Sequence, residues 1–249
     1  MNDPTNSTLR LSAASVCHVG KLRIENQDRV ELRSKAGLFV LADGMGGHDG
    51  GGKASQIAVD AVMRSMESGT EPADAVLQAN AEVHRASEEH ARFGTMGTTV
   101  VAARIAGQFC ELAWVGDSRA YLLGHEIKQL TTDHSVVQQW VDQGDIAAAE
   151  ARNHPRRNVL TRALGGKRLT RDQIGSARVR FSDEHQLLLT SDGLHGLLTD
   201  DEMREIIQES DGLQAAVNGL FDLAMERGGT DNISAILVAH AHAPDLIEA

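Results

Sequence analysis

The chain has 249 residues, of which 41% are hydrophobic and only 3% aromatic, and its 24 Lys and Arg against 35 Asp and Glu give a formal net charge of −11. Such an acidic chain is a poor partner for nucleic acid or an anionic membrane, because both are polyanions. No apolar run approaches the ~18 residues of a membrane span, and residues 1–8 lack the basic and apolar regions of a secretion signal. We therefore expect a cytoplasmic protein that binds neither nucleic acid nor membrane.

Apolar runs bounded by glycine and aspartate alternate with helical stretches along the whole chain. Alternation with a period of two, or a short apolar run, predicts a strand, whereas apolar residues three or four positions apart predict a helix. In chain order the sequence predicts strands over 9–19 and 38–42, helices over 54–67 and 73–89, strands over 98–105, 109–115 and 120–123, helices over 136–143 and 147–152, strands over 179–181 and 186–190, helices over 200–208 and 213–227, and a last strand over 233–240.

Local signals mark several helix ends. Thr199 is followed three residues later by Glu202, and this capping box starts the helix at residue 200. Gly144 and Gly228 follow two other helices, where glycine readily adopts the left-handed backbone that ends a helix.

The order of the elements indicates the fold class. Consecutive strands joined by short turns, as at 109–115 and 120–123, favour antiparallel pairing over a regular βαβ repeat. No repeat or linker-like tract divides the chain. The pattern predicts an α+β layered fold in a single domain, 1–249, with the charged, histidine-rich segment 131–167 as an insertion over the core.

Aspartates follow three of the predicted strands. Asp43, Asp117 and Asp192 each stand at a strand end beside a glycine, and Asp231 stands just before the last strand. One such aspartate is ordinary turn chemistry, but four that meet on one rim would repel one another unless they were protonated or bound to cations. Carboxylate oxygens suit Mg²⁺ or Mn²⁺, and these turns contain no histidine or cysteine for zinc.

The stretch 43–52 contains six glycines between a predicted strand and a predicted helix. A phosphate-binding P-loop is one alternative, because the G-x-x-x-x-G-K spacing is present and ends at Lys53. The next residue, Ala54, lacks the hydroxyl that this motif uses for Mg²⁺. The dinucleotide-binding pattern fails as well, because Asp49 stands in place of its third glycine. We expect these glycines to let the backbone approach a metal beside Asp43.

Eight short motifs are spread in order along nearly the whole chain. They are RIENQD at 23–28, LADGMGGH at 41–48, GTMGTT at 94–99, VGDSRA at 115–120, TDHS at 132–135, HPRRNVLTRALG at 154–165, SDG at 191–193 and GTDNIS at 229–234. Each motif alone is weak, but the ordered series is very specific. It resembles the metal-dependent protein serine/threonine phosphatases of type 2C, in their compact bacterial form.

This resemblance implies a four-layer α-β-β-α sandwich with two central antiparallel sheets flanked by helices. It implies hydrolysis of phosphoserine and phosphothreonine in proteins, with in-line attack by a water or hydroxide that bridges two metal ions. Asp43, Asp192 and Arg23 would be catalytic, with the planar guanidinium of Arg23 binding the phosphate. The segment 131–167 would be a flap over the active site, and His154 within it a further substrate-binding residue.

The resemblance also implies the metal ligands. They are Asp28, Asp43, the carbonyl of Gly44, Asp117, Asp192 and Asp231. Asp43 would bridge two Mn²⁺ or Mg²⁺ ions, and Asp192 and Asp231 would complete the first site. Gly44 and Asp28 would serve the second site, directly or through water. Asp117 and Asp192 would form a weaker third site.

Two positions depart from the family pattern. Gln27 stands where many relatives carry a glutamate that can bind metal. Asp28 beside it would therefore take over as the ligand at the second site. Met45 stands where eukaryotic members have a histidine that protonates the leaving alkoxide, and a thioether cannot donate a proton. His48, His154, a metal-bound water or solvent would have to supply that proton instead.

Other functions remain as alternatives. Cys17 and Cys110 lie in apolar stretches rather than in a phosphate-binding loop, which argues against a cysteine-based phosphatase. A pseudophosphatase that binds phosphorylated partners without turnover is the second hypothesis, and the near-miss P-loop is the third. For the phosphatase we expect a monomer that acts on phosphorylated proteins and opposes a cognate bacterial serine/threonine kinase.

Overall fold

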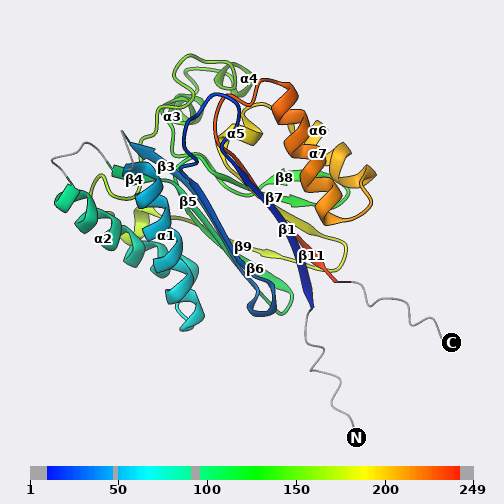
Figure 1. Cartoon of the computed structure of the whole chain (residues 1–249), viewed down its shortest axis with the longest axis horizontal. Coiled ribbons are helices and arrows are strands. Elements are labelled where there is room, and N and C mark those ends of the chain that lie inside the picture. Colours follow the sequence, from blue (N-terminus) through cyan, green and yellow to red (C-terminus); the bar gives the residue numbers. More distant parts are fainter. Residues whose placement is uncertain (1–9, 47–49, 91–95, 242–249) are drawn as a thin grey trace, which may run out of the picture.

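The long apolar runs of the sequence pair as antiparallel strands in two stacked sheets (Figure 1). The computed structural model describes residues 10–46, 50–90 and 96–241. One sheet has the order β1 (Leu11–His18), β11 (Ile233–His240), β10 (Gln186–Thr190), β7 (Arg119–Leu123) and β8 (Ile127–Gln129). The other has the order β2 (Asp28–Arg33), β3 (Leu38–Gly46), β5 (Val100–Ala106), β6 (Phe109–Val115) and β9 (Gly175–Arg180), and β4 (Met96–Thr98) pairs with the end of β3.

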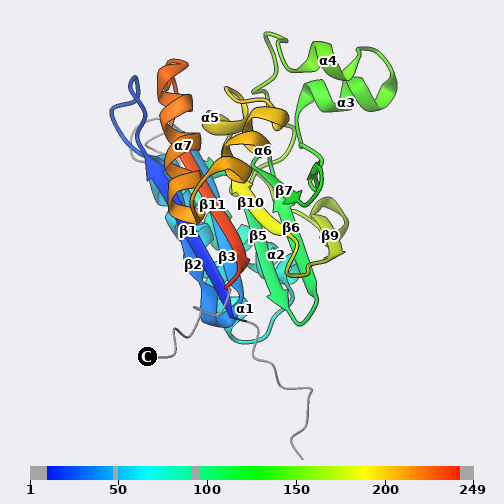
Figure 2. The same cartoon turned by 90° about the vertical axis from the view of Figure 1, so that its right-hand side faces the viewer.

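Helices cover the outer face of each sheet. The α-helices in the described ranges are α1 (Gly50–Glu67), α2 (Pro72–His90), α3 (Val136–Gln143), α4 (Ala148–Ala151), α5 (Asp192–His195), α6 (Asp200–Glu209) and α7 (Leu213–Glu226). Helices α1 and α2 pack on the sheet that contains β3, and α6 and α7 pack on the sheet that contains β11 (Figure 1). Helices α3 and α4 project from one corner, away from these layers (Figure 2).

Three apolar clusters hold the four layers together. On β3, Leu38 and Val40 face the cluster beneath α1 and α2, whereas Phe39 and Leu41 face the cluster between the sheets. A third cluster lies between the other sheet and α6 and α7. Because both faces of the central strands are buried, their sequences are almost wholly apolar. The predicted α+β fold, an α-β-β-α sandwich, is therefore confirmed.

Most predicted element ends agree with the structure. The strands at 109–115, 186–190 and 233–240 are reproduced without a shift. The capping box is present, because the Thr199 side chain accepts from the Glu202 N–H and Glu202 accepts from the Thr199 N–H. Gly144 ends α3 with a φ of 78°, in the left-handed region. No helix in the described ranges is long and apolar enough to cross a membrane.

Three elements differ from the prediction near the glycine-rich stretch. Strand β3 continues to Gly46 instead of ending at residue 42. Strand β2 was not predicted, because its charged outer residues mask the apolar alternation of Val30 and Leu32. Helix α1 begins at Gly50 rather than at residue 54. There a Cβ atom on Gly44 would lie 2.2 Å from the carbonyl oxygen of Gly51, so the glycines let two backbone segments touch. This packing of backbone on backbone is one reason for glycine here, and the expected approach of the backbone to a metal beside Asp43 stays a prediction.

Candidate active site

The strand ends bring four of the predicted aspartates to one cavity. Asp43 lies near the end of β3, Asp117 follows β6, Asp192 opens α5 directly after β10, and Asp231 precedes β11. All four line a single cavity of about 910 Å³, together with Arg23 from the loop between β1 and β2. Residues as far apart in the sequence as Arg23 and Asp231 thus lie together, because the two sheets present these strand ends at the same edge of the sandwich.

Asp28 lies beneath this cavity. It is the first residue of β2 and pairs directly with Asp43 across the antiparallel ladder. Its side chain is fully buried, and neither carboxylate oxygen has a hydrogen-bond partner. The hydroxyl of Ser234, from the other sheet, is also buried without a partner. A buried carboxylate without donors is costly unless a proton or a cation compensates its charge.

Burial, with a smaller contribution from neighbouring carboxylates, raises the pKa of four of these carboxyl groups. Burial, and then the charges of Asp28 and Asp192, raise the pKa of Asp43 well above its ordinary value. Burial is also the main cause of the raised pKa of Asp28, which is about 7. The hydroxyls of Ser191 and Ser234 lie near enough to offset part of this rise. The pKa of Asp192 rises to about 6.

Asp117 shows the same effect, because burial and the charge of Asp192 raise its pKa to about 8. Divalent cations relieve repulsion of this kind, and the donor set consists of carboxylate oxygens, which Mg²⁺ and Mn²⁺ prefer. The residues present therefore fit the metal ions that the sequence predicted. As they stand, however, no three His, Cys, Asp or Glu side chains of the described ranges are arranged so that they could hold a metal ion, and the carboxylates would have to move closer together.

Arg23 and Asp231 form an ion pair at the mouth of the cavity. Arg23 Nε donates to Asp231 Oδ1 at 2.7 Å and Arg23 Nη2 donates to Asp231 Oδ2 at 2.6 Å. The motifs imply separate roles for these two residues, phosphate binding for Arg23 and metal binding for Asp231. The structure joins them, because a cation and a carboxylate within one cavity attract each other. Asp231 must therefore turn from the arginine, or share its oxygens, in order to bind a metal.

Asn232 holds the loop that carries Arg23. Its Oδ1 accepts from the Gln27 N–H at 2.7 Å, and its Nδ2 donates to the carbonyls of Val19 and Glu25 at 3.0 and 2.9 Å. Sequence reasoning did not assign Asn232 a role. The only signal was its place next to Asp231, since its partners lie about 200 residues earlier in the chain.

Two threonines fix the backbone of Asp43 and were also missed. The Asp43 N–H donates to Thr99 Oγ1 at 3.0 Å, and the Asp43 carbonyl accepts from Thr98 Oγ1 at 2.8 Å. Gln27 and Met45 both line the cavity, as their positions in the motifs imply. His48 and the start of the motif at 94–99 lie outside the described residues.

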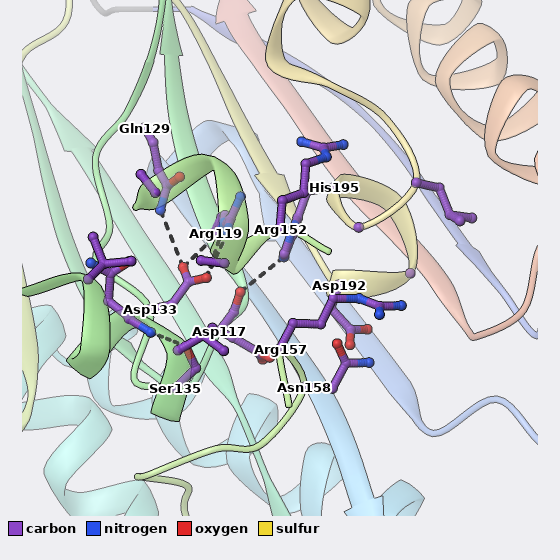
Figure 3. A pocket seen from close by; sticks show the side chains of 18 of the residues that line it. Asp117, Arg119, Gln129, Asp133, Ser135, Arg152, Arg157, Asn158, Asp192 and His195 are labelled. Carbon is purple, nitrogen blue, oxygen red and sulfur yellow. Dashed lines mark hydrogen bonds and ion pairs between the residues drawn. The ribbon is translucent and has the colours of Figure 1, made fainter. Parts of the chain in front are cut away.

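A second cavity, of about 400 Å³, lies beneath the segment 131–167 and shares Asp117, Asn158, Asp192 and Asp231 with the first (Figure 3). His195 Nε2 contacts the carbonyl oxygen of Asp117 at 3.0 Å, and so ties α5 to the turn after β6. From the segment above, Arg157 lines the cavity near Asp192 (Figure 3).

His154 lies elsewhere in that segment. Its ring packs edge-on against Trp140 with 5.1 Å between the centroids, and its Nδ1 accepts from the Arg156 N–H. It lines neither of the two cavities. The structure therefore brings the predicted aspartates and Arg23 together but leaves His154 apart from them.

Known proteins resemble this chain in sequence and in fold. The family model described as protein phosphatase 2C matches residues 21–237. The serine/threonine phosphatase stp of Listeria monocytogenes is 36% identical over 233 residues, which cover 88% of this chain and 92% of that protein.

Solved structures agree with this match. The serine/threonine phosphatase PstP/Ppp of Mycobacterium tuberculosis has a TM-score of 0.85 at 32% identity, covering 93% of this chain and 99% of that one. A PstP catalytic domain in complex with two manganese ions has a TM-score of 0.83 at 31% identity, covering 94% and 100%. The matched family model, the relatives and the shared sandwich together show that the chain belongs to the protein phosphatase 2C family of serine/threonine protein phosphatases.

Proposed function

We propose that the aspartates at the sandwich edge hold two divalent cations, Mn²⁺ or Mg²⁺, for the hydrolysis of phosphoserine and phosphothreonine in proteins. Two such cations activate water for in-line attack and neutralise charge on the phosphoryl group. The observation that carries the proposal is the convergence of four aspartates on one cavity, above the buried Asp28 whose oxygens have no partner. The manganese-bound PstP structure, which has the same fold, supports the choice of metal.

Each ligand has a proposed place. Asp43 would bridge the two ions, and Asp192 and Asp231 would complete the first site. Asp28 and the carbonyl of Gly44 would serve the second site. This assignment is supported by the direct pairing of Asp28 with Asp43 across the ladder.

We assign a weaker third site to Asp117 and Asp192. Both line the cavity beneath the segment 131–167, and the charge of Asp192 contributes to the raised pKa of Asp117. This segment is the proposed flap over the active site. The contact of His195 with the Asp117 carbonyl keeps the two ligands adjacent.

Arg23 is the proposed phosphate-binding residue. Its guanidinium presents two parallel N–H donors to Asp231, and the same fork fits two oxygens of a phosphate. The ion pair holds the arginine at the cavity mouth. When a phosphate enters, the guanidinium exchanges a carboxylate for another anion of matching geometry.

The proton for the leaving alkoxide comes, in this proposal, from water rather than from a side chain. Met45 lines the cavity and cannot donate a proton. His154 packs against Trp140 instead of facing the cavity, so we give it no direct part in the reaction.

The substrates that we propose are phosphorylated proteins made by a cognate serine/threonine kinase, with the enzyme acting as a monomer in the cytoplasm. The names of the phosphatase relatives support the substrate class. The net charge of −11 argues against nucleic acid as a partner.

The test is hydrolysis of a phosphothreonine peptide by the purified chain. We expect turnover with Mn²⁺, loss of turnover with a chelator, and a fall of at least ~100-fold in kcat for Asp192→Asn, which removes one ligand charge. Asp222→Asn, on the exposed face of α7, is the matched control and should keep full activity. Turnover that survives the chelator would contradict the mechanism, whereas phosphopeptide binding without turnover would favour the pseudophosphatase.

A further inference from the structure

Large apolar side chains gather at the mouth of the catalytic cavity. In the described ranges four large hydrophobic side chains are exposed: Leu22 at 69%, Ile24 at 99%, Phe109 at 44% and Val159 at 46%. Three of them, Leu22, Ile24 and Val159, line the same cavity as the proposed catalytic residues. We call these three residues the apolar rim. Scattered surface hydrophobics need no explanation, but their concentration at one functional opening does.

The rim stands on backbone that is held in place. Leu22 and Ile24 flank Arg23, and hydrogen bonds on both sides of them tie their loop to the segment before β11. Asn232 Nδ2 donates to the carbonyls of Val19 and Glu25, and the Lys21 N–H donates to the Gly229 carbonyl at 2.7 Å. The exposure of Leu22 and Ile24 is therefore imposed by the fold.

Val159 reaches the cavity from the proposed flap. Its carbonyl accepts from the Val136 N–H at 2.8 Å, at the start of α3, and its own N–H donates to the Arg156 carbonyl at 3.1 Å. An isolated β-bridge between Ser135 and Leu160 joins the same two segments. The rim thus has one part on the β1–β2 loop and another on the flap.

We propose that the apolar rim binds an apolar side chain next to the phosphorylated residue of the substrate, so that the enzyme prefers phosphosites with a large hydrophobic neighbour. This inference rests on the proposed function of the same cavity. A phosphate that reaches Arg23 brings its neighbours along, because successive residues of an extended chain lie about 3.3–3.6 Å apart. Burying an apolar neighbour against Leu22 and Ile24 removes apolar surface of both partners from water.

The charges at the cavity mouth also favour an apolar neighbour over an acidic one. The carboxylate of Glu25 lines this cavity next to Ile24, and it is not among the proposed metal ligands. An acidic neighbour that packs on Ile24 would meet this carboxylate, whereas an apolar neighbour meets no such repulsion.

A second copy of the chain is a weaker candidate for the occupant. Stable protein interfaces bury roughly 1,200 Å² or more, which three side chains cannot supply. Two copies that each carry a net charge of −11 would also repel each other. Continuity of the rim with the catalytic cavity instead points to the substrate itself.

The experiment compares two phosphothreonine peptides that differ only in carrying leucine or serine at the positions beside the phosphothreonine. For the wild-type enzyme with Mn²⁺ we expect kcat/KM to be about five- to tenfold higher for the leucine peptide, mainly through KM. Ile24→Ser, and the double variant Leu22→Ser with Ile24→Ser, should reduce this ratio to about one. The ratio is internal to each variant, so a merely damaged enzyme loses activity on both peptides and keeps its preference.

Phe109→Ser is the matched control. Phe109 begins β6, at the opposite end of that strand from Asp117, and its ring packs against the guanidinium of Arg178. We expect this variant to keep the wild-type preference. Equal rates of the wild-type enzyme on both peptides, or an unchanged ratio in Ile24→Ser, would overturn the inference. A dimer in solution that Ile24→Ser dissociates, without any peptide preference, would overturn it in favour of self-association.

Hydrolysis of p-nitrophenyl phosphate by the wild-type enzyme separates this inference from the proposed function. That small substrate has no neighbouring residues and does not depend on the rim. Turnover of p-nitrophenyl phosphate with equal use of the two peptides overturns only the inference. Absence of turnover on all three substrates overturns the proposed function and the inference with it.

Discussion

The carboxylate of Asp28 is buried at the start of β2 with neither oxygen hydrogen-bonded. Its pKa of about 7, raised first by burial and then by neighbouring carboxylates, means that at pH 8 the folded protein holds a charge that it does not solvate. A cation at the proposed second site would compensate that charge. Asp28 would then couple the stability of the fold to metal binding.

Replacing Asp28 with asparagine should separate these two effects, because the amide keeps the shape and removes the charge. At pH 8 with chelator, we expect the Asp28→Asn variant to melt a few degrees above the wild-type chain. With Mn²⁺ the order should reverse, since the second site has lost a ligand. Thermal melts with and without Mn²⁺ measure both effects. An equal Mn²⁺-induced rise in Tm for the two proteins would show that Asp28 does not serve the metal.

The candidate site could be predicted from the sequence only where a residue's type reveals its chemistry. Asp43, Asp117, Asp192 and Asp231 stand out because each carboxylate adjoins a strand and a glycine turn. Asn232 could not be found in this way, because it acts by accepting and donating backbone hydrogen bonds to a loop about 200 residues away in the chain. Residues that position other residues leave little trace in local sequence.

At the scale of elements, an ion pair anchors the proposed flap to the sheet. Arg119 on β7 donates to both carboxylate oxygens of Asp133, with Nη2 2.7 Å from Oδ2 and Nε 2.9 Å from Oδ1. The side chains are 23% and 10% exposed. Asp133 stands just before α3, whose first turn is capped by Ser135. The pair therefore fixes where the flap leaves the sheet.

Breaking this pair should cost stability. Asp133→Asn leaves the guanidinium of Arg119 largely buried without a counter-charge, so we expect the free energy of unfolding to fall by about 2 kcal/mol. For a chain of this size that lowers Tm by roughly 4–8 °C. The control is Asp74→Asn, which breaks the exposed pair with Arg171 and should cost less than about 0.5 kcal/mol. Similar losses in the two variants would contradict a special role for the buried pair.

Element boundaries could be predicted where burial on both faces leaves no ambiguity. Strand β10 has a wholly apolar centre, and its ends were predicted without error. Strand β2 carries Arg29 and Glu31 on its outer face and was missed. The early start of α1 at Gly50 could not be foreseen either. It depends on the close approach of Gly51 to Gly44, and helix propensity disfavours glycine.

At the scale of the whole molecule, the charge distribution ties stability to pH. Burial raises the pKa of Asp192 to about 6, of Asp28 to about 7 and of Asp117 to about 8, from an ordinary value of 3.8. Without metal the folded chain holds more protons than the unfolded chain across this window. The stability from these groups is therefore fully present below about pH 4 and is lost as the pH rises through 6 to 8.

We accordingly expect Mn²⁺ to raise the Tm more at pH 8 than at pH 6. At pH 6 protons already neutralise part of the cluster, so cations must compete with them. Melting curves at the two pH values, each with chelator and with Mn²⁺, measure the difference. A larger Mn²⁺ effect at pH 6 would contradict the raised pKa values.

The sandwich itself explains how an acidic chain can bind an anionic substrate. Its two sheets gather the aspartates at one edge, where two divalent cations would change the formal charge from −11 to −7 and, with Arg23, reverse the local field. The residue pattern predicted a layered α+β fold, and the resemblance supplied the order of the layers. The stacking of the sheets depends on contacts between strands far apart in the sequence, which composition and periodicity do not contain.

Calorimetric titration of the metal-free protein with Mn²⁺ is the sharpest test of the proposed metal centre. We expect the wild-type chain to bind two ions, with a third binding more weakly, and we expect Asp43→Asn, which removes the proposed bridging carboxylate, to lose most of this binding while remaining folded. Heat of binding that is absent from the wild-type chain, or unchanged in Asp43→Asn, would contradict this proposal.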